Sequence, residues 1–246
     1  YFHTIEYKEV LEKSYGLKSQ YYFVEDKNKI CGIFPNFQVG GGLFSKKLIS
    51  QPFAPYGGFI IDQKTKNKTR VRSLFLSKYE DIMKRQKIAF MELKSNKNLK
   101  LSGLKNNNID YSLVLKLEDK KILYSKFSKS IRRILKKDIN SELEFIYDST
   151  DIHSFYKIYS KSMKDKGSPV HSFLFFNNLF NISRKNIKIC LIKYDSKIIS
   201  VVMLITYNKN VVYSWGATLK KYKYLAPSYK MFWEIIQKIN NKYDYL

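Results

Sequence analysis

Three apolar segments follow one another in the second half of the chain, at residues 187–193, 197–206 and 210–215. Only short polar turns separate them, Asp195-Ser196 and Asn208-Lys209. Segments of this length joined by such turns predict three consecutive antiparallel strands. This half of the chain is therefore expected to be built on an antiparallel meander.

Further helices and strands are expected on both sides of this meander. Helical periodicity and helix-start residues predict helices at 122–139, from Asp151, at 173–180 and from Pro227. Residues 111–117 alternate as a strand does, and residues 243–246 begin another strand. The resulting order is strand, helices, three-stranded meander, helix and strand.

The same order is present approximately in the first half of the chain. A polar stretch at 94–108 is the candidate junction between the halves. We therefore predict an α+β protein of two tandem, related units, residues 1–109 and 110–246. Each unit is expected to contain a mixed, mainly antiparallel sheet flanked by helices, with the second unit truncated at its C-terminus.

Composition excludes several classes of protein. A hydrophobic content of 44% excludes intrinsic disorder, and two cysteines cannot form a disulfide framework, which fits a reducing compartment such as the cytoplasm. The longest apolar run, residues 198–207, is too short to span a membrane as a helix. The chain begins at Tyr1 and stops inside a strand-like segment, so we expect a fragment of a longer polypeptide.

The net charge is +24, from 45 basic and 21 acidic residues. Such an excess predicts attraction to nucleic acid, nucleotide cofactors or an anionic membrane surface. Because nearly all the basic residues are lysines in a chain rich in Asn, Ile, Tyr and Phe, A/T-rich codon usage explains the charge equally well. Arg132 and Arg133, the only adjacent arginines, are better candidates for phosphate contacts.

Five stretches of sequence, read with the element order, resemble one known family. They are Ile33-Phe34-Pro35, Ser50-Gln51-Pro52-Phe53 with Tyr56-Gly57-Gly58, Ser128 to Arg133, Met163 to Pro169 with Phe175-Phe176, and Tyr213 to Ala217 with Leu225, Pro227 and Trp233. The chain resembles the FemAB-like branch of the GNAT superfamily, including the FemAB-related acetyltransferases of polysaccharide gene clusters.

This resemblance implies direct attack of an amine on an activated acyl donor held between two splayed strands, here 210–217 and 243–246. A strand N–H polarises the acyl carbonyl, and the next helix N-terminus receives the donor's phosphates. Asp244, beside the splay, is expected to orient or deprotonate the amine, with Tyr213 as the second catalytic candidate. The implied donor contacts are Gly216, Ala226, Ser228 and Tyr229.

The predicted acceptor contacts are Arg132, Arg133, Lys136, Tyr56, Gly57 and Trp215. The basic residues form a ridge on their helix that suits a nucleotide-sugar diphosphate, a lipid-linked diphosphate or tRNA. Each candidate has a structural alternative. The basic residues could form the solvated face of an amphipathic helix, Tyr56 and Gly57 could belong to a Gly-Gly turn, and Trp215 could be a packed core side chain.

Two donors remain open, acyl-CoA and aminoacyl-tRNA. GNAT enzymes usually place a glycine-rich loop before the phosphate-facing helix, but residues 220–226 contain no glycine. That departure favours a Fem-type aminoacyl-tRNA donor. Fem enzymes, however, usually carry a long helical hairpin in the second unit, and no such hairpin is predicted here, which favours acyl-CoA.

The alternative function is a non-catalytic, basic RNA- or nucleic-acid-binding protein, in which the aromatic residues of 220–226 stack on bases. The spread of lysine along the whole chain argues against it. No ligand spacing predicts a metal site, and no Ser/His/Asp set predicts a hydrolase. We therefore expect a cytoplasmic acyl- or aminoacyltransferase acting on an amine of a sugar, peptidoglycan or other cell-envelope precursor, with peripheral contact to an anionic membrane as an option.

Overall fold

The structure, a computed structural model, describes residues 1–42, 45–95, 105, 111–137 and 142–246. It divides into two compact units: Phe2–Ile109, and Asp110–Leu246 together with Tyr1. Tyr1 therefore groups with the second unit, where its hydroxyl donates to Ser183 Oγ (2.7 Å), and not with residues 1–109. Most of the predicted junction at 94–108 lies outside the described residues.

The first unit begins with helix α1 (Ile5–Tyr15), which has a capping residue at each end. The Thr4 side chain accepts a hydrogen bond from the Tyr7 N–H and caps the first turn. Gly16 has a φ of 63°, a left-handed conformation that glycine adopts without strain. The helix therefore ends at a residue type that favours a helix C-terminus.

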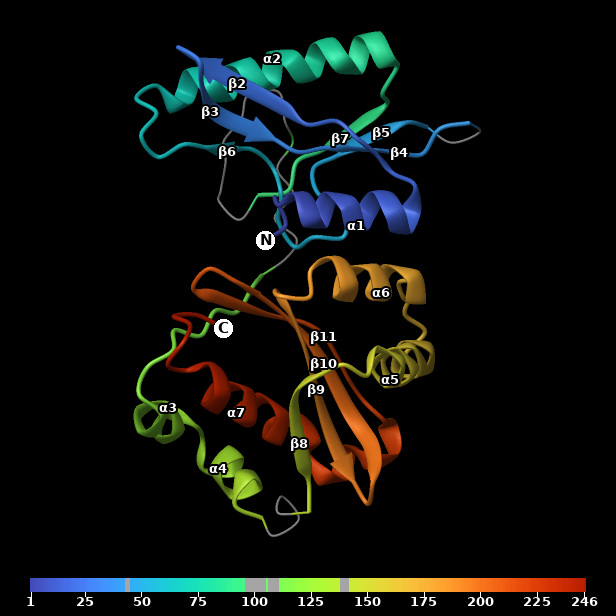
Figure 1. The fold of residues 1–246 in the computed structure, drawn as a ribbon, viewed down its shortest axis with the longest axis vertical. Coiled ribbons are helices and arrows are strands. Elements are labelled where there is room, and N and C mark those ends of the chain that lie inside the picture. Colours follow the sequence, from blue (N-terminus) through green and yellow to red (C-terminus); the bar gives the residue numbers. More distant parts are fainter. Residues whose placement is uncertain (43–44, 96–104, 106–110, 138–141) are drawn as a thin grey trace. The chain divides into compact units, whose positions relative to one another are not determined.

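Two small sheets form the rest of the first unit, together with α2 (Lys68–Gln86) (Figure 1). The strands are β1 (Lys18–Ser19), β2 (Tyr22–Asp26), β3 (Lys29–Phe34), β4 (Phe37–Val39), β5 (Lys47–Ile49), β6 (Ile60–Ile61) and β7 (Phe90–Glu92). One sheet has the order β1-β4-β5-β7, with β5 and β7 parallel, and the other has the order β2-β3-β6. Helix α2 buries Phe75 and Tyr79 against Phe34, and these rings form the core of the unit.

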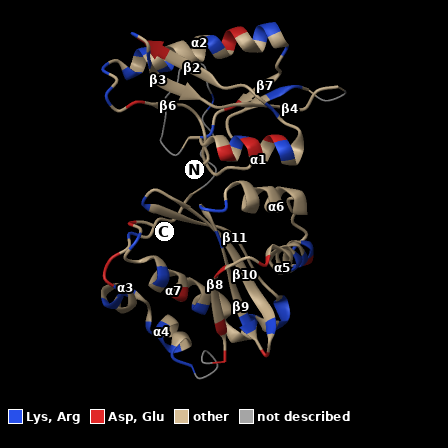
Figure 2. Ribbon diagram, in the orientation of Figure 1, with Lys and Arg blue, Asp and Glu red and all other residues tan. Residues whose placement is uncertain are grey.

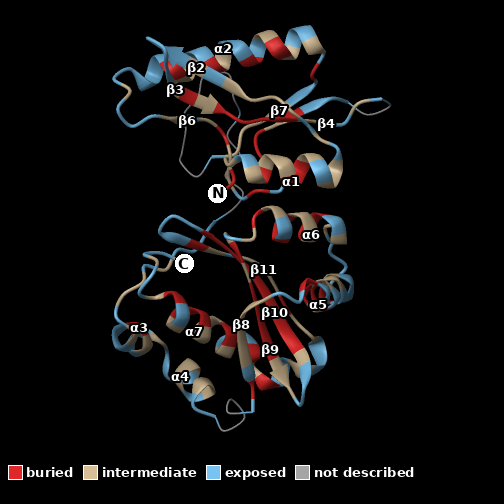
Figure 3. Ribbon diagram, in the orientation of Figure 1, coloured by how far each residue is buried: buried red, intermediate tan, exposed pale blue. Residues whose placement is uncertain are grey.

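The second unit contains the predicted meander. Its strands are β8 (Glu144–Ser149), β9 (Ile187–Tyr194), β10 (Lys197–Tyr207) and β11 (Asn210–Thr218). They form one antiparallel sheet in the order β11-β10-β9-β8. The β9–β10 turn has left-handed residues at Asp195 and Ser196, as a tight hairpin requires. Strand β10 is buried along nearly its whole length (Figure 3).

Helices cover both faces of this sheet (Figure 1). Helix α7 (Pro227–Ile239) packs on one face through Met231, Ile235 and Ile239. Helices α5 (Ile152–Asp165) and α6 (Phe173–Ile182) cover the other. Their N-caps are Asp151 and Ser172, so the predicted helix starts are confirmed.

The single helix predicted at 122–139 is wrong, because the structure has two short helices there. Helix α3 (Lys120–Lys126) ends at Phe127, whose φ of −68° and ψ of 145° are extended. Helix α4 (Lys129–Leu135) begins anew with Ser128 as its N-cap, accepting from the Ile131 N–H (3.3 Å). A local serine cap thus interrupts a continuous apolar stripe. Residues 138–139 lie outside the described range.

The predicted strands at 111–117 and 243–246 are also only partly formed. Leu115 and Leu117 bond through their backbones to Leu246 and Asp244, but only an isolated bridge at Lys116 results. Few residues here bury side chains: Leu113 is 97% exposed. Residues 111–117 and 243–246 therefore pair through a few backbone hydrogen bonds, but they do not form the two regular strands that the sequence predicts.

Candidate functional site

Strand β11 carries a β-bulge at its centre. Met203 of β10 pairs with Trp215, whereas the next residue, Leu204, pairs with Tyr213, so Ser214 is an extra residue. An extra residue shifts the side-chain alternation by one position. Tyr213 consequently faces α7 and Trp215 faces α6, so these two predicted site residues do not line a common site.

Tyr213 lies between α7 and the bare backbone of Gly216. Its ring centre is 6.0 Å from that of Phe232 on α7. A Cβ placed on Gly216 would lie 2.8 Å from Tyr213 Cε1 and 3.0 Å from its hydroxyl oxygen, so glycine leaves room for the phenol. Tyr213 is 37% exposed, and its partial burial raises the pKa of this phenol to about 12. Tyr213 is therefore a neutral hydrogen-bond donor at physiological pH.

Trp215 belongs to an aromatic cluster on the opposite face. Its ring centre lies 5.7 Å from that of Phe175, 5.5 Å from that of Phe176 and 6.4 Å from that of His171. Burial lowers the pKa of His171, so this imidazole is neutral near pH 7. The cluster packs α6 on the sheet, which matches the structural alternative for Trp215.

Strand β11 meets the end of the described chain at one edge. The Val211 N–H donates to the Tyr245 carbonyl (2.9 Å), and the Asp244 N–H donates to the Lys209 carbonyl (2.8 Å). A parallel bridge joins Asn210 to Tyr245. Beyond it β11 continues to Thr218, and no other strand of the described residues pairs with this edge. The Asp244 side chain is exposed at this contact.

The alternation of a strand fixes which amides face this open edge. Val211 and Tyr213 lie two residues apart in a stretch of regular pairing with β10. Their N–H groups therefore point to the same side. Because the Val211 N–H bonds to Tyr245, the Tyr213 N–H faces the open edge immediately before the bulge.

The first turn of α7 lies at the far end of β11. Ala226 precedes it in a left-handed conformation (φ 53°), and no side chain caps the helix. The Ser228 hydroxyl lies 3.0 Å from that of Thr218, which ties this turn to the last residue of β11. Tyr229 N–H bonds to the Ala226 carbonyl (3.1 Å). The uncapped turn leaves backbone donors with partial positive charge.

The glycine-free loop before α7 is ordered as a 3-10 helix, η2 (Lys220–Leu225). Tyr222 packs against the core of the unit and its ring lies 6.2 Å from that of Tyr194. Lys220, Lys221 and Lys223 are exposed on the same turn. Exposed ammonium groups therefore lie on the turns that lead into α7.

An apolar cavity of about 330 Å³ connects these elements. Tyr213 forms one wall, and α7 forms another with Ser228, Tyr229, Phe232 and Trp233. Three of the predicted site residues, Tyr213, Ser228 and Tyr229, therefore come together around one space. Gly216 lies against the Tyr213 ring, and Ala226 is the N-cap of α7, two residues before Ser228. The Asp244 side chain is not among the residues that line the cavity.

The basic ridge lies on α4 and at its end (Figure 2). Arg132 is half-buried, and its Nη1 donates to the Ser125 carbonyl (2.7 Å), which stabilises the α3–α4 junction. Arg133 is exposed, and Lys136 is the exposed C-cap of the helix. Because α4 is short, the basic ridge predicted on a long helix is reduced to Arg132 and Arg133 on the helix and Lys136 at its C-cap.

Tyr56 and Gly57 lie in the first unit, inside a tightly packed loop. A Cβ on Gly57 would lie 2.7 Å from the Ser50 carbonyl oxygen and 2.8 Å from Gln51 Cβ. The Gly57 N–H donates to the Lys94 carbonyl (3.1 Å). The Tyr56 ring packs edge-on against Phe2 (5.4 Å), and burial raises the pKa of its phenol. Close packing therefore explains why position 57 is a glycine and why position 56 is an aromatic residue.

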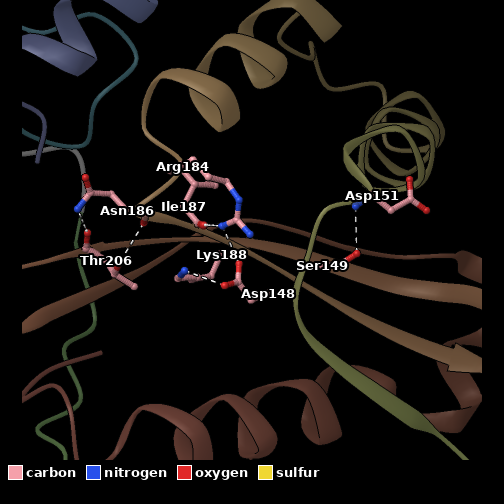
Figure 4. A network of polar contacts seen from close by, with 8 residues as sticks. All are labelled: Asp148, Ser149, Asp151, Arg184, Asn186, Ile187, Lys188 and Thr206. Carbon is pink, nitrogen blue, oxygen red and sulfur yellow. Dashed lines mark hydrogen bonds and ion pairs between the residues drawn. The ribbon is translucent and has the colours of Figure 1, made fainter.

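A polar network on β8 and β9 has no counterpart in the sequence analysis (Figure 4). Asp148, at a bulge of β8 with φ 59°, accepts from Arg184 Nη1 and Lys188 Nζ, both at 2.8 Å. Partial burial acts to raise the pKa of Asp148, but the two cations outweigh burial and hold that pKa below its usual value. Asp148 is 36 residues from Arg184 and 40 residues from Lys188 in sequence, so only the fold brings the carboxylate to these two cations.

Neither a metal cluster nor a membrane span is found in the part of the chain that the structure describes. No three His, Cys, Asp or Glu side chains among the described residues are grouped to hold an ion. Within the same ranges, no helix combines the length and the hydropathy needed to cross a bilayer.

Comparison with known proteins identifies this arrangement. Residues 125–243 match the model of the acetyltransferase (GNAT) domain. No curated protein matches the sequence. Among solved structures, FemX is similar with a TM-score of 0.68 at 11% identity, over 98% of this chain and 80% of that chain.

Two further structures have the same fold. The C-terminal domain of a putative lysylphosphatidylglycerol synthetase from Agrobacterium fabrum matches with a TM-score of 0.58 at 10% identity, over 98% of this chain and 72% of that one. A tandem GNAT protein from the clavulanic acid biosynthesis pathway matches with a TM-score of 0.55 at 6% identity, over 93% and 73%. Residues 125–243 thus carry a GNAT acetyltransferase domain, and the chain as a whole has the α+β fold seen in FemX and in a tandem GNAT protein.

Proposed function

We propose that the chain transfers an acyl group from acyl-CoA to an amine by direct attack in a ternary complex. One observation carries the proposal: the bulged, open edge of β11 leads to the uncapped first turn of α7, and both border one cavity. A thioester lying along this edge has its carbonyl near the Tyr213 N–H and its phosphates near Ser228. Holding donor and acceptor together in this way supplies most of the catalysis.

The phosphate end of the donor is held by charge and by backbone donors. The Ser228 and Tyr229 turn presents the positive end of the α7 dipole, with Ala226 setting its start. Exposed Lys220 and Lys221 add positive charge on the preceding turn. These groups replace the glycine amides that the loop lacks.

The reaction requires an amine to lose a proton and a thiolate to gain one. The amine nitrogen bonds to the acyl carbon, and the carbon–sulfur bond then breaks. Tyr213, neutral because its pKa is about 12, donates a hydrogen bond or a proton to the departing sulfur, and the proton that the amine loses replaces any proton that Tyr213 gives up. We assign to Asp244 the orientation of the amine, which its exposed position at the β11 edge allows.

The acceptor is an amine of a sugar, peptidoglycan or other cell-envelope precursor. Arg133 and Lys136, with Arg132 beside them, suit the diphosphate of a nucleotide- or lipid-linked sugar. Tyr56, Gly57 and Trp215 stay predictions as acceptor contacts, since each already has a packing role. A cytoplasmic location with peripheral membrane contact is part of the same proposal.

A second donor, aminoacyl-tRNA, is favoured by two observations. The fold is similar to that of FemX and of a putative lysylphosphatidylglycerol synthetase domain. The loop before α7 presents lysines and tyrosines without the glycines usual for CoA. Binding through such a surface depends on phosphate charge and weakens steeply with salt.

The test measures transfer and binding with both donors. Release of free thiol from acetyl-CoA in the presence of UDP-aminosugars, with loss of rate in Tyr213→Phe and Asp244→Asn, supports the first proposal. Deacylation of aminoacyl-tRNA onto an amine supports the second. If neither donor is consumed while any RNA binds in a salt-dependent manner, the chain is a nucleic-acid-binding protein and the transferase proposal is refuted.

A further inference from the structure

The cavity beside Tyr213 has an unusual lining for a site that only receives an acetyl group. Besides the walls from β11 and α7, Phe127, Ile131 and Leu135 of α4 and its N-terminal junction close it from a third side. The α4 side of the cavity is entirely apolar, and its polar groups are at the α7 first turn. An amphipathic space of this kind matches a ligand with an anionic head and an apolar tail.

Helix α4 is itself incompletely covered by protein. None of its residues is buried, and Ile131, Ile134 and Leu135 are only half-buried, although they form the apolar face of an amphipathic helix. The helix packs against α7, but the cavity lies between its apolar face and that helix. An apolar helix face normally packs against a continuous core, so the incomplete packing leaves room for an apolar ligand.

The outer side of α4 is basic while its inner side is apolar. Lys129 and Arg133 are exposed on the helix, and Lys136 follows at its end. The basic outer side is the surface that the proposed function gives to the acceptor diphosphate. The apolar inner side lines the cavity and favours the acyl chain of the donor, whose phosphates lie at the first turn of α7.

We propose that this cavity binds the chain of an acyl-CoA donor, and that the enzyme prefers medium-length apolar acyl groups to acetyl. The inference rests on the proposed function, because the carbonyl must lie at the Tyr213 end of the cavity. The volume of about 330 Å³ is roughly twice that of an apolar cavity that accommodates benzene, so a chain on the order of ten carbons fits. The transfer step itself is unchanged, with the amine replacing the thiolate on the acyl carbon.

The experiment measures dissociation constants for coenzyme A and for acyl-CoAs from two to sixteen carbons with the full chain. Each buried methylene is expected to tighten binding roughly fourfold, up to a limit near eight to ten carbons, beyond which affinity stops rising. Constant affinity from two to ten carbons overturns the cavity assignment while the proposed function stands. Failure of coenzyme A and every acyl-CoA to bind overturns the acyl-CoA donor and the cavity assignment together.

Two matched variants test whether this particular cavity is responsible. Ile131→Phe fills it and should move the limit to a shorter chain, whereas Ile122→Phe, on an exposed site of α3 (49% exposed), should leave the limit unchanged. Thermal unfolding of both variants checks that they fold. If Ile131→Phe folds and keeps the wild-type chain-length dependence, the cavity assignment is wrong.

Tryptophan fluorescence adds a readout that a remote binding site would not give. Trp233 lines the cavity, and Trp215, the other tryptophan, lies in the aromatic cluster on the opposite face. Binding of decanoyl-CoA should change the emission of Trp215→Phe, in which Trp233 is the only reporter. It should leave the emission of Trp233→Phe nearly constant. The reverse result places the chain elsewhere and overturns the proposal.

Discussion

Replacing Gly216 with alanine tests the packing that positions Tyr213. The Cβ would lie 2.8 Å from Tyr213 Cε1, about 1 Å closer than carbon atoms in van der Waals contact. Gly216 has no left-handed φ, so alanine fits the backbone and the clash is the only penalty. Overpacking destabilises by about 1–3 kcal/mol, while alanine restricts the unfolded chain and stabilises by about 0.4–1 kcal/mol. Because the ring is partly exposed and can yield, we expect a net loss of roughly 1 kcal/mol.

The sign of this effect should reverse when the tyrosine ring is removed. In a Tyr213→Ala background no ring atom remains for the new Cβ to meet, so Gly216→Ala should be neutral or stabilising by about 0.4–1 kcal/mol. Urea unfolding of the wild type, both single variants and the double variant gives the coupling energy of the pair. A loss of stability that is equally large in both backgrounds would refute the reasoning. The reasoning would also be refuted if Gly216→Ala had the stability and the donor affinity of the wild type.

Three other substitutions have expected outcomes. Asp148→Asn should lower stability by about 1 kcal/mol at neutral pH, since the carboxylate is partly exposed. The pKa of Asp148 is lower in the folded protein than in the unfolded chain, so the ionised carboxylate contributes its full stabilisation at pH values above the unfolded pKa. The difference in stability between Asp148→Asn and the wild type should therefore vanish as the pH falls through the folded pKa. Urea midpoints measured against pH test this, and a difference that stays constant with pH would contradict it. Gly57→Ala should destabilise by roughly 1–3 kcal/mol because its Cβ would meet the Ser50 backbone, and an unchanged thermal midpoint would argue against this clash. Ser172→Ala removes the N-cap of α6 and should lower the free energy of unfolding, measured by chemical denaturation, by about 1 kcal/mol. An unchanged free energy of unfolding would show that water replaces the cap without cost.

The sequence by itself determined the local elements of the second unit. Short polar turns and apolar runs specified the β9–β11 meander, while Asp151, Ser172 and Pro227 marked helix starts correctly. These features depend on neighbouring residues, and such local interactions can be read along the chain. Tyr213, Ser228 and Tyr229 were placed from motif order alone, and they line one cavity.

Only the tertiary structure decided how those elements present their side chains. The bulge at Ser214 depends on the pairing of β11 with β10, and it sends Tyr213 and Trp215 to opposite faces. The contacts of Asp148 with Arg184 and Lys188 join residues far apart in sequence. The cavity beneath α4 exists because that helix is short and packs incompletely against α7. Strand register, side-chain burial and cavity volume depend on contacts between segments that are distant in sequence. The periodicity of a local stretch of sequence therefore does not predict them.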